Sequence, residues 1–118
     1  MGRVARRIFL AVGLSLAAGC MASPTLPMPP PGEPEVDGPT AEGTVELSGR
    51  VPKPKARVFA INWTEEERGG DGFGGDYADA QGYYRFEMPG RVGDRFEIWY
   101  DYAGEDSQST LFQIRDPG

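Results

Sequence analysis

Few side chains in this sequence are of the types that carry out catalysis. The 118 residues include a single cysteine, Cys20, and no histidine. Without histidine the chain has neither a Ser-His or Cys-His nucleophile pair nor a His-ligated metal site, and one cysteine cannot form an internal disulfide. The formal net charge of -6 argues against binding to nucleic acid, which needs a clustered excess of lysine and arginine. We therefore expect a protein that is not an enzyme.

A glycine-rich stretch from 69 to 79 contains carboxylates that could serve as calcium ligands. Asp71, Asp76 and Asp79 offer the oxygen atoms that this hard cation prefers, and extracellular modules bind it only at about 0.1 to 1 mM. Their spacing matches neither the EF-hand loop nor the calcium-binding nonapeptide repeat. The alternative, a flexible solvated loop, is therefore favoured. The acidic run Glu65–Glu67 is likewise expected to be a solvated loop edge.

The first 19 residues have the pattern of an export signal. An uncharged, mostly apolar run from 8 to 19 follows a positively charged start that contains Arg3, Arg6 and Arg7. This run has 12 residues, whereas a helix needs about 20 to span a bilayer. We therefore expect a cleaved signal rather than a transmembrane helix. Residues 6–10, Arg-Arg-Ile-Phe-Leu, resemble the core of a twin-arginine signal, which leaves the route of export open.

The sequence Leu16–Cys20 resembles the lipobox of bacterial lipoproteins. The resemblance implies cleavage between Gly19 and Cys20, attachment of diacylglycerol to the Cys20 sulfur and acylation of the new amino group. Ala17 occupies the position that most often holds leucine in this family, and Met21, rather than aspartate, follows the cysteine, which favours the outer membrane. Two or more acyl chains hold a protein stably in a membrane. The alternative is an ordinary secretory signal with a free thiol.

Residues 20–42 are expected to form a disordered tether. Of the 22 residues that follow Cys20 in this range, seven are prolines and four are acidic, with almost nothing apolar to bury. In an extended polyproline II conformation, at about 3.1 Å per residue, the segment would reach roughly 70 Å and hold a domain away from the lipid headgroups. Its PxxP spacings also fit ligands of proline-recognition domains, but a spacer is favoured directly after a lipid anchor.

Residues 43–118 carry the alternating pattern of an all-β domain. Apolar side chains recur at every second position, with no helical period. A stretch rich in glycine and acidic residues, 64–79, is expected to hold a short strand near Tyr77, and a turn follows at Asp79–Gly82. We expect a small β-sandwich with strands at 43–51, 55–63, 83–88, 95–102 and 109–115.

Several positions in this region are similar to the carboxypeptidase regulatory-like domains, which have a transthyretin-like β-sandwich. The matching residues are Gly49, Ala56-x-Val58-x-Ala60, Asp79-x-x-Gly82-x-Tyr84-x-Phe86-x-Met88-Pro89 and Phe96-x-Ile98. The resemblance implies an accessory or structural module of an envelope or secreted protein, with no shared catalytic residues. The chain departs from this family in its long segment 64–75.

The alternation also predicts which side chains face the core. We expect buried side chains at Val58, Ala60, Tyr84, Phe86, Met88, Phe96, Ile98, Tyr100 and Tyr102. Side chains at the alternate positions of the same strands should point to solvent, and several of them are large and aromatic. A binding face would form from Phe59, Trp63, Tyr83 and Trp99. Aromatic side chains of this kind stack on sugar rings or anchor a protein partner. The alternative is that the loop or the tether covers them, or that the phase is inverted.

Together these patterns predict a lipid-anchored protein of the bacterial cell envelope, with the outer membrane favoured. Removal of residues 1–19 takes away three arginines and leaves 9 basic against 18 acidic residues, a net charge near −9. The expected function is a non-catalytic module that docks another envelope protein. A glycan-binding module assisted by calcium is the alternative, and a small enzyme is a third candidate.

Overall fold

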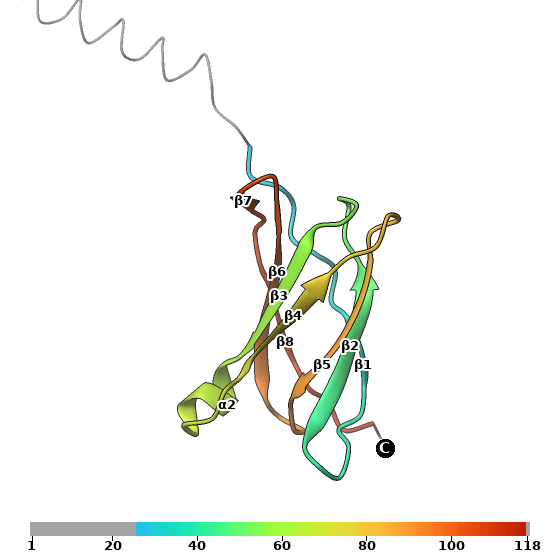
Figure 1. Cartoon of the computed structure of the whole chain (residues 1–118). Coiled ribbons are helices and arrows are strands. Elements are labelled where there is room, and N and C mark those ends of the chain that lie inside the picture. Colours follow the sequence, from blue (N-terminus) through green and yellow to red (C-terminus); the bar gives the residue numbers. More distant parts are fainter. Residues whose placement is uncertain (1–25, 118) are drawn as a thin grey trace, which may run out of the picture.

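The computed structural model describes residues 26–117 as a small sandwich of two antiparallel β-sheets (Figure 1). In sequence order the elements are β1 (Glu35–Asp37), β2 (Thr44–Arg50), β3 (Arg57–Asn62), α2 (Trp63–Glu67), β4 (Phe73–Tyr77), β5 (Tyr83–Pro89), β6 (Arg95–Tyr102), β7 (Glu105–Asp106) and β8 (Thr110–Gln113). The smaller sheet has the order β1-β2-β5 and the larger has β4-β3-β6-β7, with β8 also paired to β6. This architecture confirms the predicted all-β class.

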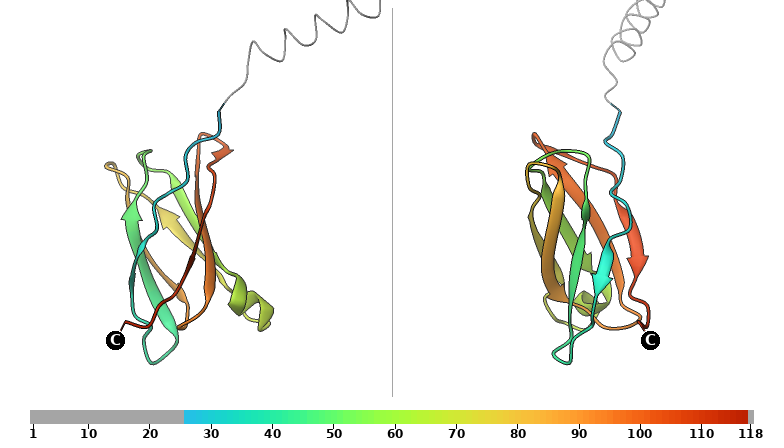
Figure 2. Two further views of the ribbon diagram at one scale, coloured as in Figure 1. Left: turned by 180° about the vertical axis from the view of Figure 1, so that it is seen from behind. Right: turned by 90° about the vertical axis from the view of Figure 1, so that its right-hand side faces the viewer.

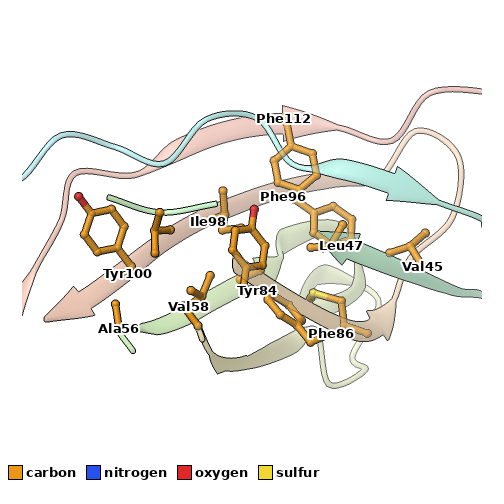
Figure 3. Close-up of a cluster of buried hydrophobic side chains, with 14 of the residues drawn as sticks. Val45, Leu47, Ala56, Val58, Tyr84, Phe86, Phe96, Ile98, Tyr100 and Phe112 are labelled. Atoms are coloured by element: carbon orange, nitrogen blue, oxygen red, sulfur yellow. The ribbon is translucent and has the colours of Figure 1, made fainter. Parts of the chain in front are cut away.

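The alternation of side chains places the core between the two sheets, as Figure 3 shows. The five strands expected after residue 43 are all present, within two residues of their expected bounds. Tyr102 is the exception among the side chains expected inside: it is 38% exposed, because β6 ends there beside the two-residue β7. The buried apolar residues are Val45, Leu47, Val51, Ala56, Val58, Ala60, Ala78, Tyr84, Phe86, Met88, Phe96, Ile98, Tyr100, Phe112 and Ile114.

A short helix, α2, lies in the segment that the sequence pattern assigns to a loop. Asn62 caps this helix, because its side-chain oxygen accepts a hydrogen bond from the Glu65 backbone N–H at 3.0 Å. Asparagine is among the preferred N-cap residues. Glu65 and Glu66 place negative charge in the first turn, where the helix dipole favours it. The acidic run is therefore part of a capped helix, and the prediction of a loop edge is wrong.

Glycines after α2 allow β4 to lie close to both β3 and β5. A Cβ atom at Gly74 would be 2.8 Å from the Met88 Cβ atom, and one at Gly75 would overlap the Val58 carbonyl oxygen. Side chains at these positions would push the strands apart, so the absence of a Cβ is what permits the approach. The stretch is thus an ordered strand, paired with β3, and the short strand expected near Tyr77 is confirmed.

Residues 28–42, which the sequence places in a disordered tether, belong to the folded domain. β1 pairs with β2 over residues 35–37. Pro31 and Pro34 are buried, and Met28 packs against the hydrophobic core. The domain therefore begins at about Met28 rather than at residue 43.

Backbone carbonyl groups attach this segment to the larger sheet. The Tyr100 hydroxyl donates a hydrogen bond to the Pro29 carbonyl oxygen at 2.8 Å, and the Thr110 hydroxyl donates one to the Pro31 carbonyl oxygen. A backbone N–H of the β7–β8 loop donates to the Met28 carbonyl oxygen at 3.1 Å. Proline has no N–H to satisfy, so a proline-rich segment can lie extended on a sheet with only its carbonyl oxygens paired. Figure 2 shows this segment passing from the larger to the smaller sheet.

Candidate functional site

The outer surface of the larger sheet gathers aromatic side chains from neighbouring strands. Phe59 of β3 lies opposite Trp99 of β6, and their rings stack with centroids 5.6 Å apart and 29° between their planes. On the β4 side, the Phe73 ring lies 5.8 Å from that of Phe59. Trp63 follows β3, and Tyr77 ends β4. We call these five residues, Phe59, Trp63, Phe73, Tyr77 and Trp99, the aromatic face.

The aromatic face is open to solvent at its margins and bordered by charged groups. Phe59 and Trp99 are half-buried, whereas Trp63, Phe73 and Tyr77 are exposed. The Trp63 indole N–H donates to the Glu97 carboxylate at 3.1 Å, which holds the ring against β6. The Arg57 guanidinium lies 4.8 Å from the centroid of the Phe59 ring and 5.6 Å from that of Tyr77.

Three of the four residues predicted to form a binding face are brought together, and Tyr83 is not. Tyr83 begins β5 and lies opposite Arg50 of β2, whose guanidinium is 5.3 Å from the centroid of its ring. It is therefore exposed on the smaller sheet, away from Phe59 and Trp99. The prediction is wrong at this position because alternation gives the side on which a residue lies but not the sheet to which its strand belongs.

Two members of the aromatic face, Phe73 and Tyr77, are absent from the sequence prediction. They are four residues apart in β4, so the period of two places both on the same side of the strand. The intervening residues are Gly-Gly and Asp76. Because glycine is typical of loops, this composition conceals the strand that carries both rings.

The three aspartates considered as calcium ligands do not come together. Asp71 and Asp76 each accept a hydrogen bond from a nearby backbone N–H of β4, at 3.2 and 2.7 Å. Asp79 accepts two such bonds at 2.9 Å in the turn before β5, a common arrangement for aspartate in turns. Within residues 26–117 there is no group of three or more carboxylate, imidazole or thiol side chains that could hold a metal ion. The calcium alternative is therefore not supported by these residues, and the favoured interpretation, a flexible loop, is wrong over Phe73–Tyr77, which form β4.

Asp94 is a buried carboxylate that the sequence pattern does not reveal. The Arg68 guanidinium donates to its two oxygens at 3.1 and 2.8 Å. The Asn62 side-chain amide and the Arg91 backbone N–H donate to Oδ2 at 2.8 and 3.0 Å. Arg68 also pairs with Glu65 at 2.6 Å. These contacts join α2 to the turn between β5 and β6.

The pKa of Asp94 agrees with a structural role for this carboxylate. Burial by itself raises the pKa, but the hydrogen bonds from Arg68, Asn62 and the Arg91 backbone outweigh burial and hold the pKa below its ordinary value of 3.8. Hydrogen bonds to Asp94 and then to Glu65 raise the pKa of Arg68. The carboxylate is therefore ionised and paired at neutral pH, whereas a proton-transfer group needs a pKa near the working pH.

Comparisons with protein-family models, with curated proteins and with solved structures return no match. The similarity to carboxypeptidase regulatory-like domains stays a prediction from the sequence. The predicted export signal, the cleavage between Gly19 and Cys20 and the lipidation of Cys20 lie outside the described residues. In the part of the chain that the structure describes, no helix is long and apolar enough to cross a membrane.

Proposed function

We propose that this protein is a non-catalytic lipoprotein of the bacterial cell envelope, anchored at Cys20 in the outer membrane, that binds another envelope protein through its aromatic face. The observation that carries the proposal is the row of aromatic rings across β4, β3 and β6, formed by Phe73, Phe59 and Trp99. Contiguous apolar groups on the surface of a small domain are typical of interaction sites. The lipobox-like sequence Leu16–Cys20 supports the anchor.

The orientation of the rings favours a protein partner over a glycan. Stacking on a sugar requires an open ring face, but the Phe59 ring already packs against the Trp99 ring and beneath the Arg57 guanidinium. The exposed members of the aromatic face are Trp63, Phe73 and Tyr77. Such groups enter apolar pockets of a partner protein, where aromatic residues carry much of the binding energy. Arg57 and Glu97 supply the polar rim that surrounds the apolar centre of protein interfaces.

Lipidation is tested by fatty-acid labelling in bacterial cells that export the full chain. We expect an alkyne-bearing fatty acid to label the wild type and to leave Cys20→Ser unlabelled, because that change removes the only thiol. The wild type is also expected to stay with the membrane fraction after a salt wash, since several acyl chains anchor a protein stably. The Met21→Ala variant is the matched control and should be labelled as well as the wild type. A wild type without label would contradict the anchor.

Docking through the aromatic face is tested by photo-crosslinking in the same cells. A photoreactive residue at Phe73 is expected to give one discrete adduct with an envelope protein, roughly tenfold stronger than the adduct from the same residue at Tyr83. Phe73 and Tyr83 are matched because they are 50% and 55% exposed but lie on different sheets. Trp63→Ala should remove the adduct while the thermal melt stays cooperative, with only the modest loss of stability that follows from removal of its hydrogen bond to Glu97, since Trp63 lies outside the core.

Other outcomes of this experiment would contradict a protein partner at this face. Equal adducts from Phe73 and Tyr83 would show non-specific contact. An adduct of twice the mass of the chain would indicate self-association. Binding to a glycan array that is lost in Trp63→Ala, with no adduct in cells, would indicate a glycan instead.

A further inference from the structure

The chain enters the folded domain at the end that carries three of its loops. β1 is antiparallel to β2, with Glu35 opposite Ser48, so residues before Glu35 leave the sandwich where β2 ends. The β2–β3 loop (51–56), the β4–β5 loop (78–82) and the β6–β7 turn (103–104) lie at this same end, and α2 lies at the other (Figures 1 and 2). We call it the loop end.

The anchor and the loop end are separated by a short length of chain. Seven residues, 21–27, lie between Cys20 and Met28, the first described residue that packs against the core. At about 3.3 to 3.6 Å per residue, the fully extended chain spans at most about 30 Å. A lipid on Cys20 would therefore keep the loop end close to the headgroups, and not at the roughly 70 Å that a tether through residue 42 would permit.

The loop end also holds positive charge that the domain leaves unpaired. Residues 50–57 contain Arg50, Lys53, Lys55 and Arg57, which include both lysines of the chain, and no acidic residue. None of these four forms an ion pair with a carboxylate in the described part of the chain. Elsewhere in that part, ion pairs hold Arg68, Arg85, Arg95 and Arg115. An unpaired basic cluster in an otherwise acidic domain is a site for an anionic surface.

Negative charge at the other end of β3 makes the charge distribution of the domain asymmetric. Helix α2 carries Glu65–Glu67. Glu65 pairs with Arg68 and Glu67 with Arg95, which leaves Glu66 without an ion pair in the described part of the chain. Strand β3 separates α2 from the β2–β3 loop (Figure 1). An anionic surface would attract the β2–β3 loop and repel α2. The loop end itself also carries acidic residues: Asp79 in the β4–β5 loop, Asp101 opposite Arg57, and Glu105 and Asp106 in β7. The attraction is therefore confined to the β2–β3 loop.

The basic residues border a depression that can receive a headgroup. Lys55 and Arg57 line an open hollow of about 610 Å³ together with Asp101, Tyr102 and other residues of the loop end. The Lys53 ammonium group lies 5.4 Å from the centroid of the Tyr102 ring. Lysine and arginine are the side chains that bind phosphate oxygens, and tyrosine is enriched at membrane surfaces.

We propose that the β2–β3 loop contacts the phosphate groups of anionic phospholipids in the membrane that holds Cys20. This rests on the proposed lipid anchor. The contact makes the strands stand upright on the membrane, with α2 farthest from it. The aromatic face then points sideways, toward a partner protein in the same membrane.

The test attaches the protein to vesicles without help from the cell. The chain that starts at Cys20 contains every described residue, and its one thiol couples to a maleimide phospholipid. The vesicles contain phosphatidylcholine alone or with about 30% phosphatidylglycerol, which supplies the anionic surface. Lys53 and Lys55 are the only lysines, so amine acylation followed by mass spectrometry reports directly on the β2–β3 loop. The matched control is Glu66→Lys, which places an amine in α2.

We expect acylation of Lys53 and Lys55 to slow about fivefold on the anionic vesicles, and to recover in about 0.5 M NaCl, which screens charge beyond a few ångström. The amine introduced by Glu66→Lys should slow less than about twofold. Equal slowing of all amines would reflect only the lower pH near an anionic surface and would overturn the proposal, as would no slowing at all. The maleimide attaches the protein to the vesicle chemically, so the vesicle experiment does not depend on lipidation in cells. Absence of fatty-acid label in cells would refute the anchor. The acylation rates would still show whether the β2–β3 loop contacts anionic lipid.

Discussion

A chain shortened to begin at Gly43 is expected to lose cooperative folding. It lacks β1, the packing of Met28 and the hydrogen bonds that Tyr100 and Thr110 donate to residues 29–31. At roughly 1 kcal/mol per hydrogen bond and about 2 kcal/mol per large apolar side chain buried, the loss is about 5 kcal/mol. That is between about a third and the whole of the free energy of unfolding expected for a domain of this size, at about 0.05 to 0.15 kcal/mol per residue.

Thermal melts followed by circular dichroism measure this effect. A chain that begins at Leu26 is the matched control and should melt cooperatively, because it keeps every described residue. Tyr100→Phe in the full chain removes only the hydroxyl that donates to Pro29, and we expect it to lower the free energy of unfolding by about 1 kcal/mol. If the chain from Gly43 melted within a few degrees of the chain from Leu26, residues 28–42 would not be part of the domain.

Replacement of Asp94 by alanine is expected to lower the free energy of unfolding by about 1 to 3 kcal/mol near neutral pH. The change takes a hydrogen-bond acceptor from Arg68, from the Asn62 amide and from the Arg91 backbone N–H. The Asn62 amide keeps the Pro89 carbonyl oxygen and Arg68 keeps Glu65, so the cost comes from a buried network that is only partly satisfied. Denaturant titration measures the loss. Glu87→Gln, at an exposed position of β5, is the control and should change stability by less than about 0.5 kcal/mol.

The dependence of stability on pH tests the same carboxylate. The pKa of Asp94 in the folded protein lies below its ordinary value of 3.8, so the unfolded chain takes up the proton more readily. The stabilisation by Asp94 is therefore fully present above about pH 5 and is lost as the pH falls through the folded pKa. The difference in unfolding free energy between the wild type and Asp94→Ala should shrink in this range. A difference that is the same at about pH 7 and pH 3 would contradict this account.

Alternation predicted the strands that bury one face and expose the other. In β5 the sequence alternates between buried Tyr84, Phe86 and Met88 and exposed neighbours, and the same signal identifies β2 and β6. β3 is apolar on both sides, so it was predicted as a strand without alternation. β4 lacks it, because two glycines stand where side chains would alternate. α2 has five residues, too few to display a helical period.

The sequence pattern did not predict that residues 28–34 belong to the folded domain, and the physical reason is different. Residues 28–34 pair mainly through carbonyl oxygens, and carbonyl pairing leaves no trace in the pattern of side chains. The prolines that made the segment resemble a tether are also what allows it to lie on the sheet without unpaired N–H groups.

The candidate site was predicted only in part. The sequence of a single strand shows which side chains share a side, but it does not show which strands pair. Phe59 and Trp99 follow from the phase of β3 and β6, but their stacking depends on the pairing of these strands. Tyr83 was misplaced because its strand pairs with β2. Asp94 contacts Asn62 and Arg68, which lie 32 and 26 residues before it in the sequence. No local pattern connects positions that are so far apart.

β1 also protects one edge of the smaller sheet. It is a three-residue edge strand with an acidic residue at each end, and Pro34 and Pro39 lie on either side of it. Short edges that carry charge and proline are poor templates for a strand from another chain. Without β1, the seven residues of β2 would form the edge of the smaller sheet. Copies held in one membrane by the proposed anchor would meet often, because they would diffuse in two dimensions, and β1 would keep this edge of the smaller sheet from pairing with another copy.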